Sequence, residues 1–237
     1  MKRNSIKEFT TLKNIEVIFE DNHLLSVNKR SSDIVQVDKT GDLSLEDIAK
    51  EYIKVKYEKP GNVFLGVTHR IDRPVSGIVL FAKTSKALAR INEMFQKKEI
   101  TKKYWAIVKV KPPQESGRLS NYLKRNESKN ITTVYNSEIK DSKLAILDYK
   151  IIADIDGYYL LEVSLITGRH HQIRAQLGFI GCPIIGDNKY GYTRANKDLS
   201  IHLHSKTMEF AHPVTKELIT INAKLPDDVI WNRFKSI

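Results

Sequence analysis

Short runs in which apolar and polar residues alternate are spread over the whole chain, and they predict a protein rich in β-strands. In the first third, the runs at 16–19 and 24–28 flank a polar turn sequence at 21–23, which predicts a β-hairpin. Further runs at 63–67 and 78–82 predict two more strands.

Three segments carry apolar residues at helical spacing instead. Residues 45–57 have one apolar face and follow Ser44, which opens a sequence similar to a capping box. A second helix is predicted after Ser85, which can cap it, and its apolar face consists of Leu88, Ile91, Met94 and Phe95. A third, short helix is predicted over 170–180, with Gly181 as its terminator.

The second half of the chain is dominated by β-type patterns. Strands are predicted at 104–110 and within 144–167, where Asp156-Gly157 indicates a type I′ turn. Residues 111–143 are polar and contain Pro112-Pro113, which predicts an irregular, exposed excursion. The closing strands are predicted at 201–204, 206–210 and 217–223. Strands interspersed with a few helices favour an α+β fold, and we expect one domain over 15–237 behind a flexible arm at 1–14.

Composition and charge narrow the function. The chain has 237 residues and a formal net charge of +11, which favours a polyanionic partner, nucleic acid first and an anionic membrane surface second. The single cysteine, Cys182, excludes an intramolecular disulfide and fits a reducing cytosol. Apolar runs fall short of the roughly 20 residues that a membrane span needs, and the first residues do not resemble a secretory signal. We therefore expect a cytoplasmic protein that does not bind a membrane.

The most informative segment is 69–83, which reads HRIDRPVSGIVLFAK. It places one carboxylate, Asp72, between the guanidinium groups of Arg70 and Arg73, just before a Ser-Gly turn and an apolar strand. A cation at ~4 Å stabilises a carboxylate by about 4 kcal/mol at an effective dielectric constant of ~20, and so keeps it anionic, as a nucleophile requires. The pattern favours a catalytic carboxylate over the alternative, a structural Arg–Asp ion pair.

This segment resembles the H-R-L-D-R-x-T-S-G-x-x-x-x-A-K signature of the RluA branch of the RNA pseudouridine synthases, with Ile71 and Val75 as mild departures. The resemblance implies that Asp72 is the catalytic residue. It also implies that Arg70 enters the RNA stack when the target uridine flips out. We assign His69 and Arg73, in the same signature, to base flipping and RNA binding.

A second match is Lys102-Lys103-Tyr104-Trp105-Ala106-Ile107-Val108, which is similar to the family's K-x-Y-x-A-x-V motif. In the family this tyrosine stacks on the target base, so the resemblance implies a catalytic role for Tyr104, although a tyrosine on an alternating strand is more often a core residue. Lys102 and Lys103 are candidate phosphate contacts. The same reading extends to Lys97 and Lys98, and to Lys124, Arg125 and Lys129 in the polar excursion, with solvated surface as the alternative.

A third match covers 167–191, TGRHHQIRAQLGFIGCPIIGDNKYG, which resembles T-G-R-x-H-Q-I-R-x-H-L-x-x-x-G-x-P-I-x-G-D-x-x-Y-G. Arg174 corresponds to the arginine that pairs with the catalytic aspartate, and Ile173 is implied to wall the base pocket. Arg169 is a further candidate for RNA contact. Gln176 stands where histidine is common. On the predicted helix, His170 and Arg174 would share a face.

The last match is Ile201-His202-Leu203-His204 with Met208 to Pro213, which resembles the family's closing L-H-L-H-A…L-x-F-x-H-P segment. Taken alone, His202, His204 and His212 could suggest a metal site. No carboxylate-rich motif accompanies them, and the family's chemistry needs no metal, so we expect neither a metal nor a cofactor.

The resemblance covers about 15–230 through four motifs in the family's order. It implies a mixed, largely antiparallel sheet flanked by helices, with a central RNA cleft. We expect a monomeric isomerase that converts uridine in structured RNA, ribosomal RNA first and transfer RNA second, to pseudouridine. Two departures are visible: 28–35 lacks the proline and glycine of the family's N-K-P-x-G-x-x-V element, and too few residues precede Ile15 for an S4 domain. A catalytically silent RNA-binding or ribosome-assembly factor is the alternative, and a metal-dependent hydrolase rests only on the histidines.

Overall fold

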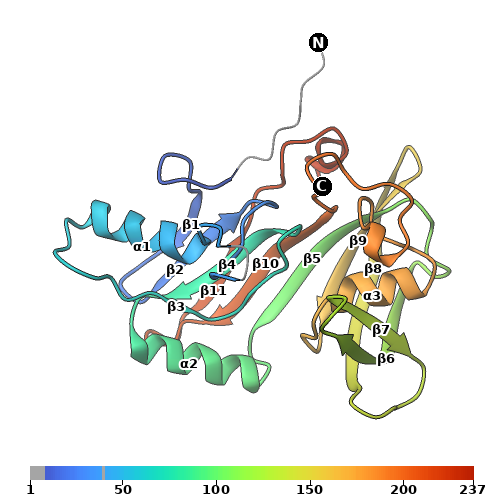
Figure 1. Ribbon diagram of the computed structural model, residues 1–237, viewed down its shortest axis with the longest axis horizontal. Coiled ribbons are helices and arrows are strands. Elements are labelled where there is room, and N and C mark those ends of the chain that lie inside the picture. Colours follow the sequence, from blue (N-terminus) through green and yellow to red (C-terminus); the bar gives the residue numbers. More distant parts are fainter. Residues whose placement is uncertain (1–8, 39–40) are drawn as a thin grey trace. The chain divides into compact units, whose positions relative to one another are not determined.

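The computed structural model describes residues 9–38 and 41–237, which fall into two compact units. Unit 1 consists of Met1–Thr101 and Ser205–Pro226, and unit 2 of Lys102–His204 and Asp227–Ile237. Each unit has its own strands and helices, which the ribbon in Figure 1 labels.

Unit 1 is built on antiparallel strands in the order β1-β2-β4-β10, with β3 beside β4 and β11 beside β10. The strands are β1 (Val17–Glu20), β2 (Leu24–Lys29), β3 (Gly66–Val67), β4 (Ser76–Ala82), β10 (Leu203–Ala211, of which the first two residues belong to unit 2) and β11 (Leu218–Asn222). The predicted strands at 201–204 and 206–210 are therefore one strand, and the strand predicted at 63–67 is reduced to its last two residues.

In the described part of unit 1 there are two helices. One begins at the predicted capping residue and the other begins at a different one. Helix α1 (Leu45–Lys56) begins at a capping box in which Ser44 accepts the N–H of Asp47 and the carboxylate of Asp47 accepts the N–H of Ser44. Helix α2 (Ser85–Gln96) is capped by Thr84 rather than by Ser85, because the Thr84 hydroxyl accepts the N–H of Ala87. Helix α2 packs against β4, as Figure 1 shows.

The main core of unit 1 lies between helix α2 and the strands. Every residue of β4 is buried, and the apolar face of α2 contributes Ala87, Ile91 and Met94. Met208 and Phe210 from β10 and Ile221 from β11 pack into the same cluster. Burial of such side chains, each worth roughly 1.5–3 kcal/mol, is the main source of stability for this unit.

Gly77, at the start of β4, is required by a close backbone approach. Its φ is +108°, and a Cβ built there would lie 2.3 Å from the carbonyl oxygen of Ser205. We expect Gly77→Ala to destabilise the protein by at least about 4 kcal/mol, because backbone atoms cannot move aside as a side chain can. Gly61→Ala is the matched control, since Gly61 also has a positive φ (+80°) but nothing within 4 Å, and should cost only about 1–2 kcal/mol. Denaturant unfolding of both variants checks this, and equal losses would contradict the steric explanation.

Unit 2 contains five strands in the order β5-β9-β8-β6-β7. They are β5 (Thr101–Val108), β6 (Ser116–Asn126), β7 (Ile131–Tyr135), β8 (Lys143–Ile155) and β9 (Tyr158–Leu165). The turn between β8 and β9 has positive φ at both Asp156 and Gly157, as a type I′ turn requires. Two short 3₁₀ helices, η1 (Asn188–Tyr190) and η2 (Trp231–Phe234), also belong to unit 2.

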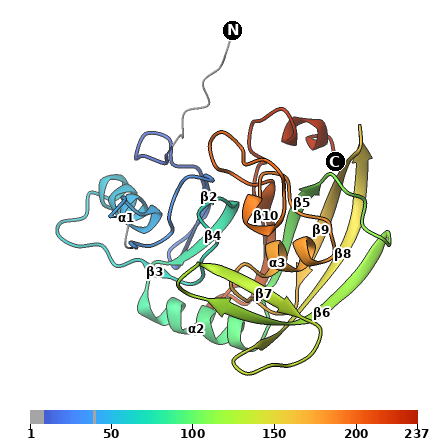
Figure 2. The ribbon, with the colours of Figure 1, turned by 45° about the vertical axis from the view of Figure 1, so that its right-hand side comes forward.

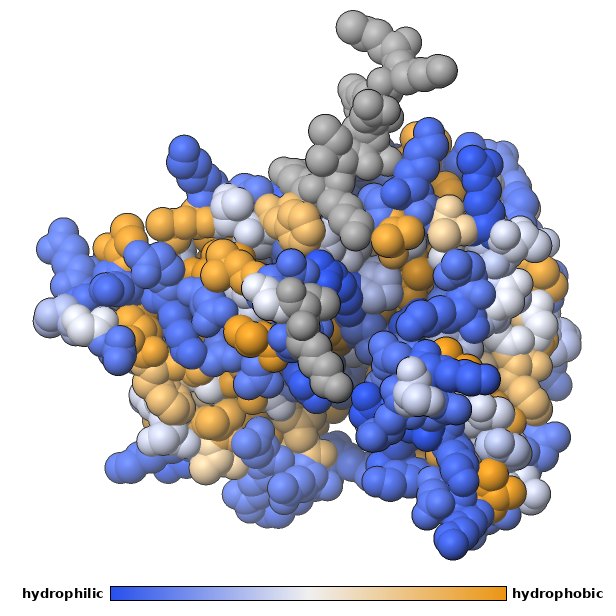
Figure 3. All heavy atoms as spheres, viewed as in Figure 1, coloured by the Kyte–Doolittle hydropathy of each residue, from blue (hydrophilic) through white to orange (hydrophobic). Residues whose placement is uncertain are grey.

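The irregular excursion predicted over 111–143 is wrong, because most of it forms β6 and β7. These strands are polar because one side of them faces solvent. The other side packs into a small hydrophobic cluster, in which Leu123 contacts Ala145 and Ala175 and the partly buried Val134 packs against them. Figure 3 shows hydrophilic residues gathered over this part of unit 2. Strands whose residues are mostly polar resemble a loop in the sequence, which explains the wrong prediction.

Helix α3 (Gln172–Phe179) is shorter than the predicted segment 170–180. It begins two residues later because His171 adopts a left-handed conformation with φ +53°. His170 therefore lies outside the helix, and the predicted shared face with Arg174 is wrong. Figure 2 shows α3 beside β6 and β7, which it contacts. Gly181, with φ +78°, follows the helix as predicted.

Together these elements confirm an α+β fold with largely antiparallel strands and, among the described residues, three α-helices. Of the arm predicted at 1–14, residues 1–8 lie outside the described part. Thr10 is buried, and its N–H and hydroxyl donate to the carboxylate of Asp33 at 2.9 and 2.6 Å. In the described ranges no helix is both long and apolar enough to cross a membrane.

Candidate active site

Asp72 lies on the short turn that joins β3 to β4. The N–H of Val75 donates to the carbonyl of Asp72 at 3.0 Å and closes the turn, and the hydroxyl of Thr68 donates to the carbonyl of Leu80 at 2.6 Å. Ile71 and Val75 are buried on either side, whereas Asp72 is half-buried. The apolar neighbours therefore anchor the turn, and Asp72 is only partly covered.

The other polar residues of the signature have different surroundings. Arg70 is exposed. The Nε2 of His69 accepts the N–H of Leu80 at 3.1 Å, and its ring lies 5.5 Å from that of Phe95. Arg73 donates to the carbonyl of Ser32 at 3.1 Å and to the carboxylate of Asp42 at 2.6 Å. His69 and Arg73 thus hold the signature in place, a structural role that the sequence reading did not assign to them.

In the segment at 28–35, Arg30 and Ser32 stand at the positions of the missing proline and glycine, and the side chains of Lys29 and Asp33 hold the turn. Lys29 is 1% exposed, and its ammonium group donates to three carbonyl oxygens, those of Arg30, Asp33 and Arg73. Asp33, also buried, accepts from Thr10 and from the N–H of Arg30. A buried lysine satisfied by three carbonyls ties this segment to the Asp72 turn, a connection that the sequence reading missed.

Burial lowers the pKa of Lys29 to about 7, while the charges of Asp33 and Asp72 raise it. Between pH 7 and the ordinary lysine value of 10.5 the folded state thus binds fewer protons than the unfolded state, so stability should rise with pH in this window. We expect the wild type to gain roughly 3 kcal/mol of unfolding free energy relative to Lys29→Met between pH 7 and 9.5. Urea unfolding at several pH values measures this difference. A constant difference would contradict a perturbed Lys29.

Tyr104 lies in β5, opposite Val163 of β9, and is 6% exposed. The two lysines before it differ from each other. Lys103 pairs with the carboxylate of Glu162 at 3.0 Å, whereas burial lowers the pKa of Lys102. A Cβ on Gly168 would lie 3.9 Å from the Nζ of Lys102, so this lysine is near the third motif. The two lysines are therefore not equivalent surface cations.

Arg174, on α3, is held by a residue that the sequence reading did not single out. Its Nε donates to Oδ2 of Asp187 at 2.7 Å and its Nη2 donates to Oδ1 at 2.9 Å, a bidentate pair with side chains 5% and 1% exposed. The guanidinium carbon also lies 5.2 Å from the ring centre of Tyr190. The signal was present, because Asp187 and Tyr190 are both part of the matched G-D-x-x-Y-G motif.

The loop before α3 is fastened to β8 by Gln172. Its side chain accepts from the hydroxyl of Thr167 at 2.8 Å and from the N–H of Arg169 at 2.9 Å, and donates to the carbonyl of Ile146 at 3.0 Å. Arg169 is exposed, and its Nε donates to the carbonyl of Leu144 at 3.0 Å. Ile173 is buried, and its role in the wall of a base pocket stays a prediction.

Three more contacts explain how α3 is positioned against β6 and β7. Gln176, where histidine is common in the family, is fully buried and donates to the side-chain oxygen of Asn121 at 2.9 Å. The hydroxyl of Tyr190 accepts the N–H of Thr132 at 2.9 Å and lies 2.7 Å from Nδ1 of His171. The helix that carries Arg174 is thus hydrogen-bonded to the strand pair that the sequence reading took for a loop.

The histidines of the closing motif contact aromatic and acidic residues. His202 and His204 lie beside Trp231, at 5.7 and 5.8 Å between ring centres. His212 lies 2.9 Å from the carboxylate of Asp21. In the described part of the chain, no three His, Cys, Asp or Glu residues are grouped so that they could hold a metal ion.

The predicted site residues therefore fall in both units. Asp72, Arg70, Arg73 and His69 belong to unit 1, and Tyr104, Lys102, Lys103, Arg169, Ile173 and Arg174 to unit 2. Each half is ordered by its own buried ion: Lys29 in unit 1 and the Arg174–Asp187 pair in unit 2. The pairing of Arg174 with Asp72 stays a prediction.

The sequence is similar to a known protein family and to named relatives. Residues 23–178 match the family described as RNA pseudouridylate synthase. The chain is 33% identical over 234 residues to ribosomal large subunit pseudouridine synthase C of Vibrio vulnificus, covering 96% of this chain and 70% of that protein. The protein of the same name from Rickettsia prowazekii is 30% identical over 216 residues, covering 89% and 68%.

Solved structures show the same fold. Human RNA pseudouridylate synthase domain containing 4 superposes with a TM-score of 0.78 at 22% identity, covering 93% of this chain and 92% of that one. Human RNA pseudouridylate synthase domain containing 1 gives a TM-score of 0.74 at 20% identity, covering 92% and 86%. The family match, the sequence relatives and the motifs agree, and the chain belongs to the RNA pseudouridylate synthase family and is an isomerase of that class.

Proposed function

We propose that this enzyme converts specific uridines in structured RNA to pseudouridine, with ribosomal RNA as the first candidate substrate and transfer RNA as the second. The order rests on the relatives, which are named for the ribosomal large subunit. The excess positive charge of the chain suits either RNA, since basic residues contact the phosphate backbone irrespective of sequence. We further propose that the enzyme acts in the cytoplasm as a monomer, without a metal or cofactor.

Asp72 carries the proposal, because it is a half-buried carboxylate on an anchored turn, inside the family signature. In the reaction the C1′–N1 bond of the uridine breaks, the uracil rotates, and a C5–C1′ bond forms while the proton on C5 leaves and N1 gains one. The reaction is an isomerisation, so it needs neither an oxidant nor an energy source. Asp72 acts at C1′ or C6 as nucleophile or as the stabilising charge, and Tyr104 and Ile173 contact the base.

Arg70 supports base flipping. Its guanidinium is exposed on the segment that leads into Asp72, so it can enter an RNA stack without first leaving a buried position. A flipped uridine leaves a gap whose unstacking costs a few kcal/mol, and a planar guanidinium that stacks on the neighbouring bases offsets part of that cost.

The test is to map carbodiimide adducts, which stop reverse transcription at pseudouridine, in total RNA. Three strains are compared: one with the wild-type protein, one with Asp72→Asn and one without the protein. A stop found only with the wild type identifies the target uridine and the need for Asp72 together. Identical maps in all three strains, with RNA binding retained, would instead support the silent RNA-binding or assembly factor.

A further inference from the structure

The proposed reaction places a negative charge on the base. When the C1′–N1 bond breaks, its two electrons stay on the uracil, and the charge spreads over N1, C5 and the two carbonyl oxygens. A preorganised cation in a poorly solvated site stabilises such a charge better than water does, and loss of one group of this kind costs about 10²–10³-fold in rate. The need is the same whether Asp72 acts at C1′ or at C6.

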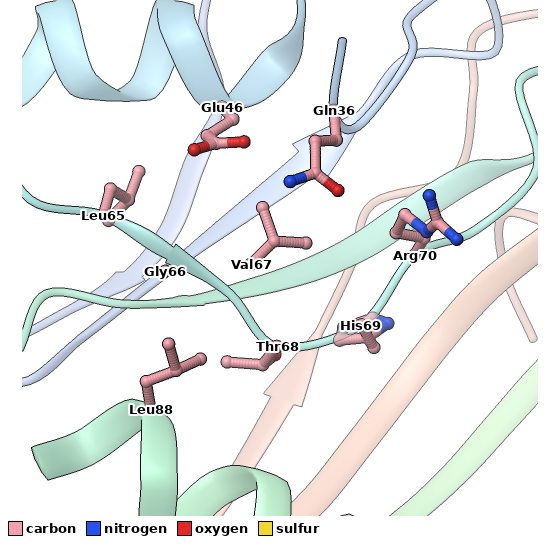
Figure 4. Close-up of a pocket in the computed structure, with 9 residues that line it drawn as sticks. All are labelled: Gln36, Glu46, Leu65, Gly66, Val67, Thr68, His69, Arg70 and Leu88. Carbon is pink, nitrogen blue, oxygen red and sulfur yellow. The ribbon is translucent and has the colours of Figure 1, made fainter. Parts of the chain in front are cut away.

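Three arginines assigned to the site have other roles. Figure 4 shows the side chain of Arg70 extending from the loop that follows β3, and in the proposed function it enters the RNA stack. Arg73 binds the carboxylate of Asp42 at 2.6 Å. The charge of Arg174 is balanced by Asp187 in a buried pair. These roles leave the charge on the base without an assigned cation.

Lys102 lies on the same face of β5 as Tyr104, because side chains two residues apart on a strand share a face. Tyr104 is opposite Val163 of β9, and Val163 is opposite Tyr149 of β8. Residues directly opposite each other share a face of the sheet. Helix α3 packs against Ala145, which lies on that same face of β8. Lys102, Tyr104 and α3 are therefore on one face of the sheet in unit 2.

The ammonium group of Lys102 reaches the loop that precedes α3. A Cβ built on Gly168 of that loop would lie 3.9 Å from Nζ of Lys102. The side chain is half-buried, and burial lowers its pKa, so its charge acts on a neighbouring group more strongly than that of a solvated lysine. Lys103 lies on the opposite face and binds the carboxylate of Glu162. The two lysines of the motif therefore have different surroundings.

We propose that Lys102 is a catalytic residue, whose ammonium group contacts a carbonyl oxygen of the flipped uracil and stabilises the charge that forms when the C1′–N1 bond breaks. The proposal rests on the proposed function, and it replaces the assignment of Lys102 to a phosphate contact. Lys102 stays protonated throughout, so the proton balance is unchanged: one proton leaves C5 and N1 gains one. Tyr104, on the same face, contacts the ring of the same base.

Single-turnover rates at saturating RNA, measured together with RNA affinity, separate this role from a phosphate contact. Lys102→Met should lower the rate about 10²–10³-fold. Its RNA affinity should stay within about threefold, because the charge on the base arises only after binding. Lys102→Arg keeps the charge and should recover at least about tenfold of the lost rate. Lys150→Met is the control, since Lys150 is exposed and lies opposite Glu162 on the other face of the sheet, and its rate should change by no more than about twofold.

Two results with Lys102→Met would overturn the proposal. One is a wild-type rate with weaker binding and a salt slope of log Kd lower by about one, which indicates a phosphate contact. The other is a wild-type rate with unchanged binding. Circular dichroism and Tm show whether the variant is folded, and if it is not, the comparison with Lys102→Arg decides through its pH dependence.

The pH dependence of kcat/KM is a second readout, which a purely structural role would not change. Lys102 must be charged to act, and its pKa lies below the ordinary lysine value of 10.5. The ratio of kcat/KM for the wild type to that for Lys102→Arg should therefore fall between pH 7 and pH 10, since arginine keeps its proton. Tyr104 and Lys29 are present in both proteins, so the ratio removes any titration of theirs. A constant ratio would contradict the role of Lys102 although pseudouridine forms, whereas a wild type that forms no pseudouridine on any RNA would refute the proposed function itself.

Discussion

Asp72→Asn should form pseudouridine at least about 10³-fold more slowly than the wild type, a rise of roughly 4 kcal/mol in the barrier. The amide has the shape of the carboxylate but neither its charge nor its nucleophilicity, so the step at C1′ or C6 loses its reacting group. Release of tritium from RNA that carries [5-³H]uridine measures the rate directly, because the C5 hydrogen is lost only when the product forms.

Asp42→Asn is the control for this change. Asp42 carries an exposed carboxylate that binds Arg73 of the same signature at 2.6 Å, so its loss disturbs the loop but removes no reacting group. Its activity should stay within about threefold of the wild type, since an exposed ion pair contributes only about 0–1 kcal/mol. RNA binding and the circular dichroism spectrum of Asp72→Asn should also be unchanged. A wild-type rate in Asp72→Asn would refute the catalytic assignment.

Asp187→Asn should destabilise the protein by about 3–5 kcal/mol, because it leaves the guanidinium of Arg174 buried without its counter-charge. For a chain of this size each kcal/mol lowers Tm by roughly 2–4 °C, so a fall of roughly 6–20 °C is expected. Activity should fall as well, since Arg174 loses the bidentate contact that fixes its orientation. Calorimetry and the tritium assay report the two effects separately.

The chain offers a matched control for this pair. Arg118 and Asp148 form the same bidentate geometry, at 2.7 and 2.8 Å, but their side chains are 62% and 41% exposed. Asp148→Asn should therefore cost no more than about 1 kcal/mol. The double change Arg174→Met with Asp187→Leu should recover much of the stability and none of the activity. Equal losses in Asp187→Asn and Asp148→Asn would contradict the role of burial.

Local signals in the sequence predicted much of unit 1. The capping box at Ser44, the hairpin of β1 and β2 and the buried strand β4 each depend on neighbouring residues, and each is confirmed. The predicted start of α3 lies two residues too early, because His171 adopts a left-handed conformation that is usually found at glycine or asparagine. Nothing in the local sequence indicates that a histidine does so here.

The larger errors came from contacts between residues far apart in the chain. Strands β6 and β7 are polar and gain their burial from α3, which follows them in the sequence by some forty residues, so alternation alone could not distinguish them from a loop. For the site, the motifs indicated Asp72, Tyr104 and Arg174. Lys29, which bonds to the Asp72 turn, and Asp187, which pairs with Arg174, lie within matched motifs but were not singled out. Lys29 and Asp187 are charged residues that would ordinarily be assigned to the surface, and only the fold shows that they are buried.

The division of unit 1 into two stretches of sequence affects how the chain reaches its native state during translation. Strand β4, buried along its whole length, leaves the ribosome with β2 already made, but its neighbour β10 is synthesised only after almost all of Lys102–His204. Until then the edge of β4 that will pair with β10 is largely unpaired and apolar, the kind of feature that promotes aggregation and that chaperones bind. A fragment that ends at residue 204 contains only the first two residues of β10, so the same edge of β4 would stay open in it.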